Sequence, residues 1–316
     1  MDKHKVPETM LQAVRQFADP QTAHDFFAQI RWPNGVACPR MGCGTDLVTY
    51  LPKYRRWYCN ECKRQFSAKV GTIFEDSPIG LDKWLPAIWL IASNRNGISS
   101  HELARALEVT QKTAWFMLQR IRLAMKDKHF EPLTGEVEVD ETYVGGSLRF
   151  SKKARALTKA GHEIDFRVSK TAALGIVQRG GQARAWVVAN VGKRDLLPKM
   201  LKHIHQDATV HTDSSSAYTD INEHFLYHHV VNHSIEEWVR GNAHINNIEG
   251  FWSVLKRTIG GTYIHVDPKH LDRYLDEQLF RFNERENMDG PRFAKATKGA
   301  DGKRLTYKTL TNKGLA

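Results

Sequence analysis

The stretch Asn242-Ala-His-Ile-Asn-Asn-Ile-Glu-Gly-Phe-Trp-Ser-Val-Leu-Lys-Arg257 carries the pattern around which the rest of the chain can be arranged. Four of its apolar residues recur at spacings of three and four, which predicts a helix with one buried stripe: Ile245, Ile248, Trp252 and Leu255. Glu249 and Lys256 share a neighbouring face, with Asn246 one turn before Glu249. A carboxylate at the edge of a core is costly unless it is paired or metal-bound. The helix is therefore either a surface helix with a solvated Glu and Lys or part of a functional site.

Length and composition set broad bounds on the protein. The 316 residues are enough for two or three domains, and an apolar fraction of 41% supplies an ordinary globular core. The formal net charge of +11 favours a polyanionic partner such as nucleic acid, although basic soluble proteins without such a partner are common. We expect no membrane span and no signal peptide, so the expected location is the cytoplasm, in association with the nucleoid. In that reducing compartment cysteines are more often metal ligands than disulfides.

Four cysteines fall within 25 residues, in pairs spaced Cys-x4-Cys and Cys-x2-Cys: Cys38, Cys43, Cys59 and Cys62. Each pair can form a knuckle that presents two thiolates, and two knuckles make a tetrahedral site for a structural zinc ion. We therefore predict a zinc ribbon at residues 36–75, after an N-terminal helical segment at 1–35 whose helix spans 8–31. The alternative is four unrelated buried thiols, which is disfavoured because the chain has no other cysteine.

Residues 80–130 are expected to form a helix-turn-helix DNA-binding domain. An apolar helix over 81–94 precedes a second helix, capped by Ser99 or Ser100, that ends near Leu107. Thr110 can cap a third helix, whose first turn would present the groove-contacting side chains Gln111, Lys112 and Thr113. Helical hairpins also occur without DNA, and the basic net charge favours the DNA-binding interpretation.

Beyond a charged linker the periodicity changes from helix to strand, which predicts a mixed α/β domain at residues 135–287. The expected order is three strands, a helix, two strands, the helix quoted above and a last helix over 267–287. A basic loop is expected at 147–170 and a basic C-terminal tail at 288–316. The predicted fold class is therefore multidomain α+β.

Three acids occupy informative places in this order. Asp140 lies on the first strand, Asp213 at the end of the fourth, and Glu249 on the later helix. If the first and fourth strands are neighbours and the helix crosses them, the three carboxylates converge. Converging carboxylates repel one another unless divalent cations neutralise them, and oxygen ligands suit magnesium or manganese. Two such ions can support in-line attack on a phosphodiester, with Lys256 holding a DNA phosphate. Solvated carboxylates and helix-capping acids are the plainer alternative, because acids are abundant.

The combination resembles the zinc-ribbon insertion-sequence transposases of the DDE class. The matching stretches are Arg31-Trp-Pro-Asn-Gly35 before Cys38-Pro39, the Cys59-x2-Cys62 knuckle, Val139-Asp-Glu-Thr-Tyr-Val-Gly-Gly146, His211-Thr-Asp213, His244-Ile-Asn-Asn-Ile-Glu-Gly-Phe-Trp-Ser-Val-Leu-Lys256, Asp272-Arg-Tyr-Leu-Asp-Glu277 and Arg281-Phe-Asn-Glu-Arg285. The resemblance covers roughly residues 20–287. One departure is the first knuckle, with four residues between its cysteines where two are commoner, which bears on the zinc geometry.

The resemblance implies a ribonuclease-H-like catalytic domain and a DDE transposase that uses two magnesium or manganese ions. It implies that Asp140, Asp213 and Glu249 are the metal-binding triad and that Lys256 is the accessory basic residue. Members vary at the third acid, so Asn246 is the alternative there. The implied partners are the terminal inverted repeats and target DNA. The reaction class implies a homodimer or larger assembly on DNA.

Two other functions compete with the transposase. One is a zinc and helix-turn-helix DNA-binding regulator with an inactive catalytic domain, against which the three intact acids argue. The other is a metal-dependent phosphohydrolase that uses His211, Asp213 and His244. The lack of a paired His-Asp motif elsewhere argues against it, and each of these histidines more often belongs to a core or supports a ligand.

Overall fold

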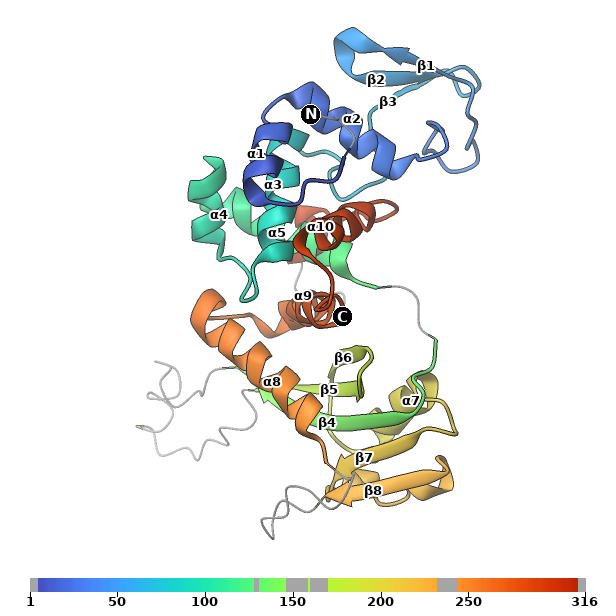
Figure 1. Ribbon diagram of the computed structural model, residues 1–316, viewed down its shortest axis with the longest axis vertical. Coiled ribbons are helices and arrows are strands. Elements are labelled where there is room, and N and C mark those ends of the chain that lie inside the picture. The colour runs from blue at the N-terminus through green and yellow to red at the C-terminus, as the bar shows by residue number, and fades with distance from the viewer. Residues whose placement is uncertain (1–4, 128–130, 146–158, 160–169, 232–243, 312–316) are drawn as a thin grey trace. The chain divides into compact units, whose positions relative to one another are not determined.

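The computed structural model describes residues 5–127, 131–145, 159, 170–231 and 244–311 (Figure 1). The chain divides into two compact units. The first combines residues 1–126 with 284–316, and the second is the continuous segment 127–283. Most of the predicted basic loop at 147–170 and part of the quoted stretch, residues 242–243, lie outside the described residues. Within the described part of the chain, no helix is long and apolar enough to cross a membrane.

The N-terminal helical segment contains two helices, α1 (Met10–Phe17) and α2 (Pro20–Arg31), so the single helix predicted over 8–31 was wrong. The Asp19 side chain accepts a hydrogen bond from the backbone N–H of Thr22, and Pro20 occupies the first position of α2. An N-capping Asp followed by Pro starts a new helix, because proline lacks the N–H that would continue the previous one.

The zinc ribbon is a three-stranded antiparallel sheet of strands β1 (Val48–Leu51), β2 (Arg56–Cys59) and β3 (Gln65–Phe66), in that order. A short 3-10 helix (Pro52–Tyr54) joins β1 to β2. Trp57 of β2 is buried and stacks on His24 of α2, with ring centroids 5.1 Å apart. The ribbon is thereby anchored to the helical segment through an aromatic contact.

Three helices follow the ribbon: α3 (Leu81–Ser93), α4 (Ser100–Leu107) and α5 (Gln111–Met125). The Ser99 side chain caps α4 in a capping box with Glu102, and the Thr110 side chain accepts a hydrogen bond from Thr113 N–H at the start of α5. The predicted boundaries of this hairpin therefore agree with the structure, while its role in DNA binding stays a prediction.

The C-terminal segment is not a tail, which corrects the prediction for residues 288–316. Helices α10 (Asp289–Lys298) and α11 (Tyr307–Thr311) belong to the first unit, where α10 packs on α3. Phe293 is fully buried, and its ring centroid lies 5.2 Å from that of Trp89. Composition misled here because a few apolar residues at helical spacing decide packing even among many lysines.

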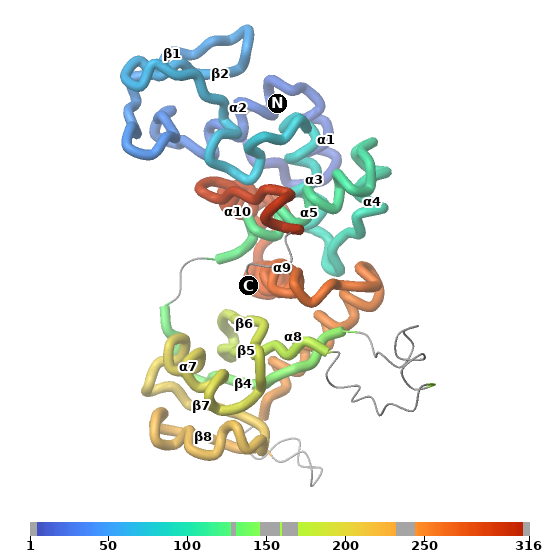
Figure 2. The backbone as a smooth tube through the Cα atoms, turned by 180° about the vertical axis from the view of Figure 1, so that it is seen from behind, coloured from blue at the N-terminus to red at the C-terminus, as the bar shows by residue number. Residues whose placement is uncertain are grey.

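The second unit is built on a five-stranded sheet with the order β6-β5-β4-β7-β8. Its strands are β4 (Glu136–Val144), β5 (Thr171–Gln178), β6 (Ala183–Val188), β7 (Thr209–Asp213) and β8 (Tyr227–Val231). Neighbours β4, β5 and β6 pair antiparallel, whereas β7 pairs parallel with both β4 and β8. The predicted adjacency of the first and fourth strands is confirmed, and Figure 2 shows β7 and β8 extending the sheet beyond β4.

Helices cover this sheet on two faces. Helix α7 (Lys193–His203) shares one core with β4, where Val137 and Val139 are fully buried. Helices α8 (Asn246–Thr258) and α9 (Leu271–Asn283) share a second core with β5 and β6. The predicted stripe of Ile245, Ile248, Trp252 and Leu255 is buried in this second core, although α8 begins four residues later than Asn242. The described residues also include a π-helical turn (Ile259–Tyr263) and the 3-10 turns Ser216–Tyr218, Ile221–Glu223 and Pro268–His270.

Candidate catalytic centre and zinc site

The four cysteine sulfurs form a cluster in the ribbon and lie within 4.8 Å of one another. The sulfurs of Cys38 and Cys62 are 3.9 Å apart, and those of Cys43 and Cys59 are 3.6 Å apart. A tetrahedral zinc ion with Zn–S bonds of about 2.3 Å requires sulfurs roughly 3.8 Å apart. The donor set therefore fits a structural zinc ion, with no position left for a substrate.

The longer first knuckle is accommodated by two glycines. Gly42 and Gly44 adopt positive φ angles of 79° and 62°, a conformation that costs other residues more. The backbone N–H of Cys38 donates to the carbonyl of Thr45 at 2.8 Å and closes the turn. The Cys-x4-Cys spacing thus brings its two thiols as close as a shorter knuckle would.

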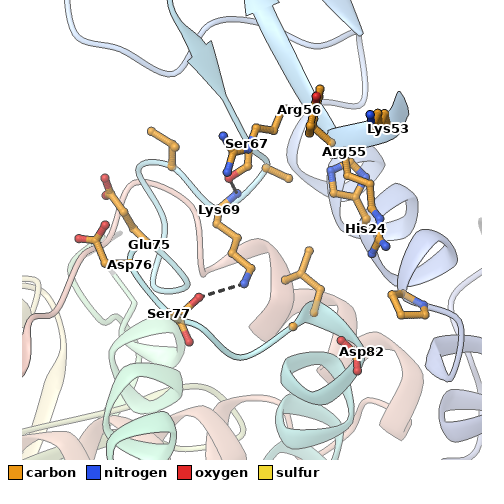
Figure 3. A pocket seen from close by; sticks show the side chains of 16 residues that line it. His24, Lys53, Arg55, Arg56, Ser67, Lys69, Glu75, Asp76, Ser77 and Asp82 are labelled. Atoms are coloured by element: carbon orange, nitrogen blue, oxygen red, sulfur yellow. Dashed lines mark hydrogen bonds between the residues drawn. The ribbon is translucent and has the colours of Figure 1, made fainter. Parts of the chain in front are cut away.

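A cavity of about 510 Å³ lies between the ribbon hairpin and the helical part of the first unit (Figure 3). Exposed cationic residues from the hairpin line one wall: Lys53, Arg55 and Arg56. Lys69 is instead engaged inside the protein, where its Nζ donates to the carbonyls of Ser77 at 3.2 Å and Ile79 at 2.5 Å. Burial lowers the pKa of Lys69. The cations that face outward are therefore those of the hairpin, which the sequence analysis did not single out.

The three residues predicted to contact DNA bases lie in the first turn of α5. The Gln111 side chain donates to Ser100 Oγ at 2.8 Å and so links α5 to α4. Lys112 is exposed, with its ammonium group 5.0 Å from the ring centroid of Tyr307. Thr113 is half-buried against the cap formed by Thr110. Gln111 and Lys112 are thus accessible on a fixed helix end.

The predicted acids come from three neighbouring elements of the second unit. Asp140 is on β4, Asp213 is the last residue of β7, and Glu249 is in the first turn of α8. Glu138 of β4 pairs with His211 of β7 in parallel register. The same offset places Asp140, in the middle of β4, level with Asp213, the last residue of the neighbouring strand β7.

Electrostatic coupling shows that the acids influence one another. The pKa of Asp140 is raised to about 7, first by burial and then by the nearby carboxylates of Glu141, Asp213 and Glu249. Among the described residues, only the cysteines form a group of potential ligands whose donor atoms all lie within 4.8 Å of one another. The donor atoms of the three acids are therefore not all within 4.8 Å of one another.

A glycine allows α8 to approach the sheet beside Asp140. Gly175 of β5 pairs with Asp140, and a Cβ atom at this glycine would lie 2.5 Å from a ring carbon of Trp252 and 2.8 Å from the Ile248 side chain. Only a residue without a side chain permits this contact. Glu249, the residue after Ile248, is thereby brought over the strand that carries Asp140.

Two further acids, Glu138 and Glu141, lie on the same strand as Asp140, and the sequence analysis gave them no role. Glu141 accepts a hydrogen bond from the Tyr218 hydroxyl, and burial raises the pKa of its carboxyl. Glu138 is fully buried on the α8 side of β4 and contacts the start of that helix. The sequence held one signal for Glu138. In an alternating strand it faces the same side as Asp140, two residues later, and in the structure α8 covers that side.

The remaining predicted residues are two histidines that contact other carboxylates and two exposed residues of α8. His211 is fully buried and its Nε2 contacts the Glu136 carboxylate, while burial lowers the pKa of the imidazole. His244 Nδ1 lies 3.2 Å from Glu138. Both histidines thus belong to a buried polar network beneath α8. Lys256 is exposed in the last turn of α8, and Asn246 is exposed at its first position.

Comparison with known proteins identifies relatives of both parts of the chain. Residues 132–283 match the ISXO2-like transposase domain, and residues 19–65 match the transposase zinc-ribbon domain. The chain is 31% identical over 255 residues to an "uncharacterized protein in transposable element ISH50" of Halobacterium salinarum, a match that covers 77% of this chain and 84% of the relative. A second relative, an "uncharacterized transposase-like protein" of Haemophilus influenzae, is 31% identical over 100 residues, or 32% of this chain and 80% of the relative. This chain therefore belongs to the family of zinc-ribbon insertion-sequence transposases of the DDE class.

Proposed function

We propose that this protein is the transposase that mobilises an insertion sequence, acting on DNA in the nucleoid. It binds the terminal inverted repeats, hydrolyses a phosphodiester at the element end and transfers the freed 3′-hydroxyl to target DNA. The observation that supports the proposal is that Asp140 and Asp213 lie level on the parallel strands β4 and β7, and that Glu249, in the first turn of α8, is close enough to contribute to the raised pKa of Asp140. The order of the five-stranded sheet, in which two antiparallel pairings (β6–β5 and β5–β4) are followed by two parallel ones (β4–β7 and β7–β8), supports a ribonuclease-H-like catalytic domain.

The three carboxylates form an all-oxygen donor set, which fits two magnesium or manganese ions. Such ions activate a water or a 3′-hydroxyl and stabilise the leaving oxygen. Burial and, after it, repulsion by neighbouring carboxylates raise the pKa of Asp140, and this repulsion makes binding of divalent cations favourable at this place. Lys256, exposed in the same helix as Glu249, binds a DNA phosphate in this assignment. The acids orient the reacting groups, and no side chain forms a covalent bond with DNA.

DNA binding is assigned to the first unit. Gln111, Lys112 and Thr113 open α5 and reach base edges in the major groove. The exposed cations of the ribbon hairpin, Lys53, Arg55 and Arg56, bind the phosphate backbone. Because two element ends are cut together, the active species on DNA is a dimer or a larger assembly.

A gel assay with a labelled element end and magnesium tests the proposal. Wild-type protein should cut the strand and release a 3′-hydroxyl, whereas Asp213→Asn and Glu249→Gln should bind the same DNA without cutting it. Normal cleavage by Glu249→Gln would move the third ligand to Asn246 or another acid. Binding without any cleavage by wild-type protein in magnesium or manganese would favour a DNA-binding regulator.

The metal-dependent phosphohydrolase is disfavoured by the contacts of its histidines. His211 is fully buried against Glu136, and His244 lies against Glu138, so both belong to a network inside the sheet face.

A further inference from the structure

Glu138 is a buried carboxylate that holds the start of helix α8. Its side chain is fully buried, and one carboxylate oxygen accepts hydrogen bonds from the backbone N–H groups of Asn247 at 2.8 Å and Ile248 at 3.0 Å. The other oxygen accepts from the Asn247 side chain at 2.8 Å and from Arg179 Nε at 2.8 Å. All four contacts depend on oxygens that only accept hydrogen bonds.

These contacts replace the cap that the local sequence does not provide. Helix α8 begins at Asn246, and the preceding residue, Ile245, has no side-chain oxygen to cap it. The backbone donors of Asn247 and Ile248 occupy the second and third helical positions, which an N-capping side chain normally satisfies. Glu138 supplies that cap from a neighbouring strand, and its negative charge lies at the positive end of the helix dipole.

Arg179 fixes the geometry of this cap. Besides its bond to Glu138, its guanidinium donates to the carbonyl oxygen of His244 at 2.7 Å, just before the helix begins. A second guanidinium nitrogen lies 3.6 Å from Glu136. Arg179 thus links strand β4 to His244, which lies just before α8, and its positive charge compensates the buried carboxylate of Glu138.

The cap and two of the proposed catalytic acids, Asp140 and Glu249, share the elements β4 and α8. Glu138 and Asp140 are two residues apart on β4 and therefore face the same side of the sheet. Glu249 directly follows Ile248, whose backbone N–H is held by Glu138. Gly175, beside Asp140, supports the next turn of α8 through Trp252. The helix is therefore fastened to the sheet at two points close to Asp140.

We propose that Glu138 is a positioning residue for catalysis, which sets α8 so that Glu249 meets Asp140 and Asp213 with the spacing that the metal ions require. This inference rests on the proposed function, because it concerns the same carboxylates. A residue that orients metal ligands typically changes metal affinity or activity by about 10- to 100-fold when replaced.

Two variants test the proposal. Glu138→Gln keeps the shape but turns one oxygen into a donor that faces other donors. Asn247→Asp leaves the core intact and adds a negative charge in the first turn, which by itself stabilises a helix, but it sets that charge against Glu138. A helix that needs only local stability would tolerate Asn247→Asp, whereas a helix held by Glu138 would be displaced. Glu277→Gln is the matched control, because Glu277 is equally buried and paired with Arg281 in α9.

Three measurements are made on the full-length protein. Hydrogen exchange should become about 10- to 100-fold faster at the Asn247 and Ile248 amides in Glu138→Gln. The Mn²⁺ concentration for half-maximal cleavage should rise about tenfold and the maximal rate should fall about 100-fold in both variants. The dissociation constant for the element end should stay within twofold of the wild-type value. The Glu277→Gln control should show none of the changes in metal dependence.

The outcomes separate this inference from the proposed function. If wild-type protein does not cut DNA, the proposed function fails, while hydrogen exchange still reports whether Glu138 holds α8. If wild-type protein cuts and both variants keep its Mn²⁺ dependence and rate within twofold, Glu138 does not position the site. Equal losses in Glu138→Gln and Glu277→Gln, with no loss in Asn247→Asp, would also overturn the proposal.

Discussion

Replacing Asp140 by Asn should stabilise the metal-free protein at alkaline pH. Burial and the neighbouring carboxylates raise the pKa of Asp140 from 3.8 to about 7. The folded state therefore holds a proton that the unfolded state has released between these two values, and stability falls as pH rises through this interval. A rise of about three units at 1.36 kcal/mol each corresponds to roughly 4 kcal/mol of destabilisation at pH 8. Asparagine carries no charge and removes this cost.

The pH dependence isolates the electrostatic effect from other changes caused by the substitution. The advantage of Asp140→Asn should be about 4 kcal/mol at pH 8 and about 1 kcal/mol at pH 4.5, where the aspartate is still protonated in the folded state. Urea unfolding in EDTA can be followed by pulsed hydrogen exchange of peptides that cover β4 and β5, so that only the second unit is observed.

In magnesium the wild-type protein should become more stable than Asp140→Asn, because the bound ion stabilises the folded wild type more than the folded variant by mass action. An advantage of the variant that is equal at both pH values, or larger at pH 4.5, would refute the assignment of a raised pKa to Asp140. A magnesium response that is identical in both proteins would remove Asp140 from the metal site.

Three other changes probe the cysteine cluster, the proposed role of α5 in DNA binding, and the contact between α8 and the sheet. Cys59→Ser should release zinc and unfold the ribbon, because metal binding and folding are coupled in such sites; metal analysis should find zinc in the wild type alone. Lys112→Ala should reduce the preference for the inverted repeat over random DNA if α5 reads bases, whereas equal loss on both DNAs would assign Lys112 to the backbone. Gly175→Ala should destabilise the second unit by about 1–3 kcal/mol in urea unfolding, since the added methyl group meets Trp252; an unchanged midpoint would mean that α8 can shift at no cost.

Patterns that are local in sequence predicted their structures well. The cysteine spacings predicted a sulfur cluster, and Ser99 and Thr110 predicted the starts of α4 and α5. The sequence analysis named the adjacency of β4 and β7 as the condition under which Asp140 and Asp213 come together, and the structure meets that condition. In each case the residues that decide the structure lie close together in the sequence or belong to the same predicted metal site.

Features that depend on contacts between distant segments were not predicted. The role of Glu138 required knowledge that α8 begins at Asn246, directly over that part of β4. The burial of Phe293 depended on rings far away in sequence, which composition does not reveal. The pair Asp19-Pro20 is a helix-start signal, but the helical pattern continues on both sides of it and favours a single helix.

The return of α10 to the N-terminal unit affects how the protein is made. Phe293 contacts the rings of Phe17 and Phe26, with centroids 5.7 and 5.8 Å apart, so the first unit is completed only after the whole of segment 127–283 has been synthesised. The continuous segment 127–283 can finish folding earlier. A product truncated before α10 exposes an aromatic surface to proteases and chaperones. A nascent chain that has not yet been synthesised through α10 therefore lacks a complete first unit even where its second unit has already folded.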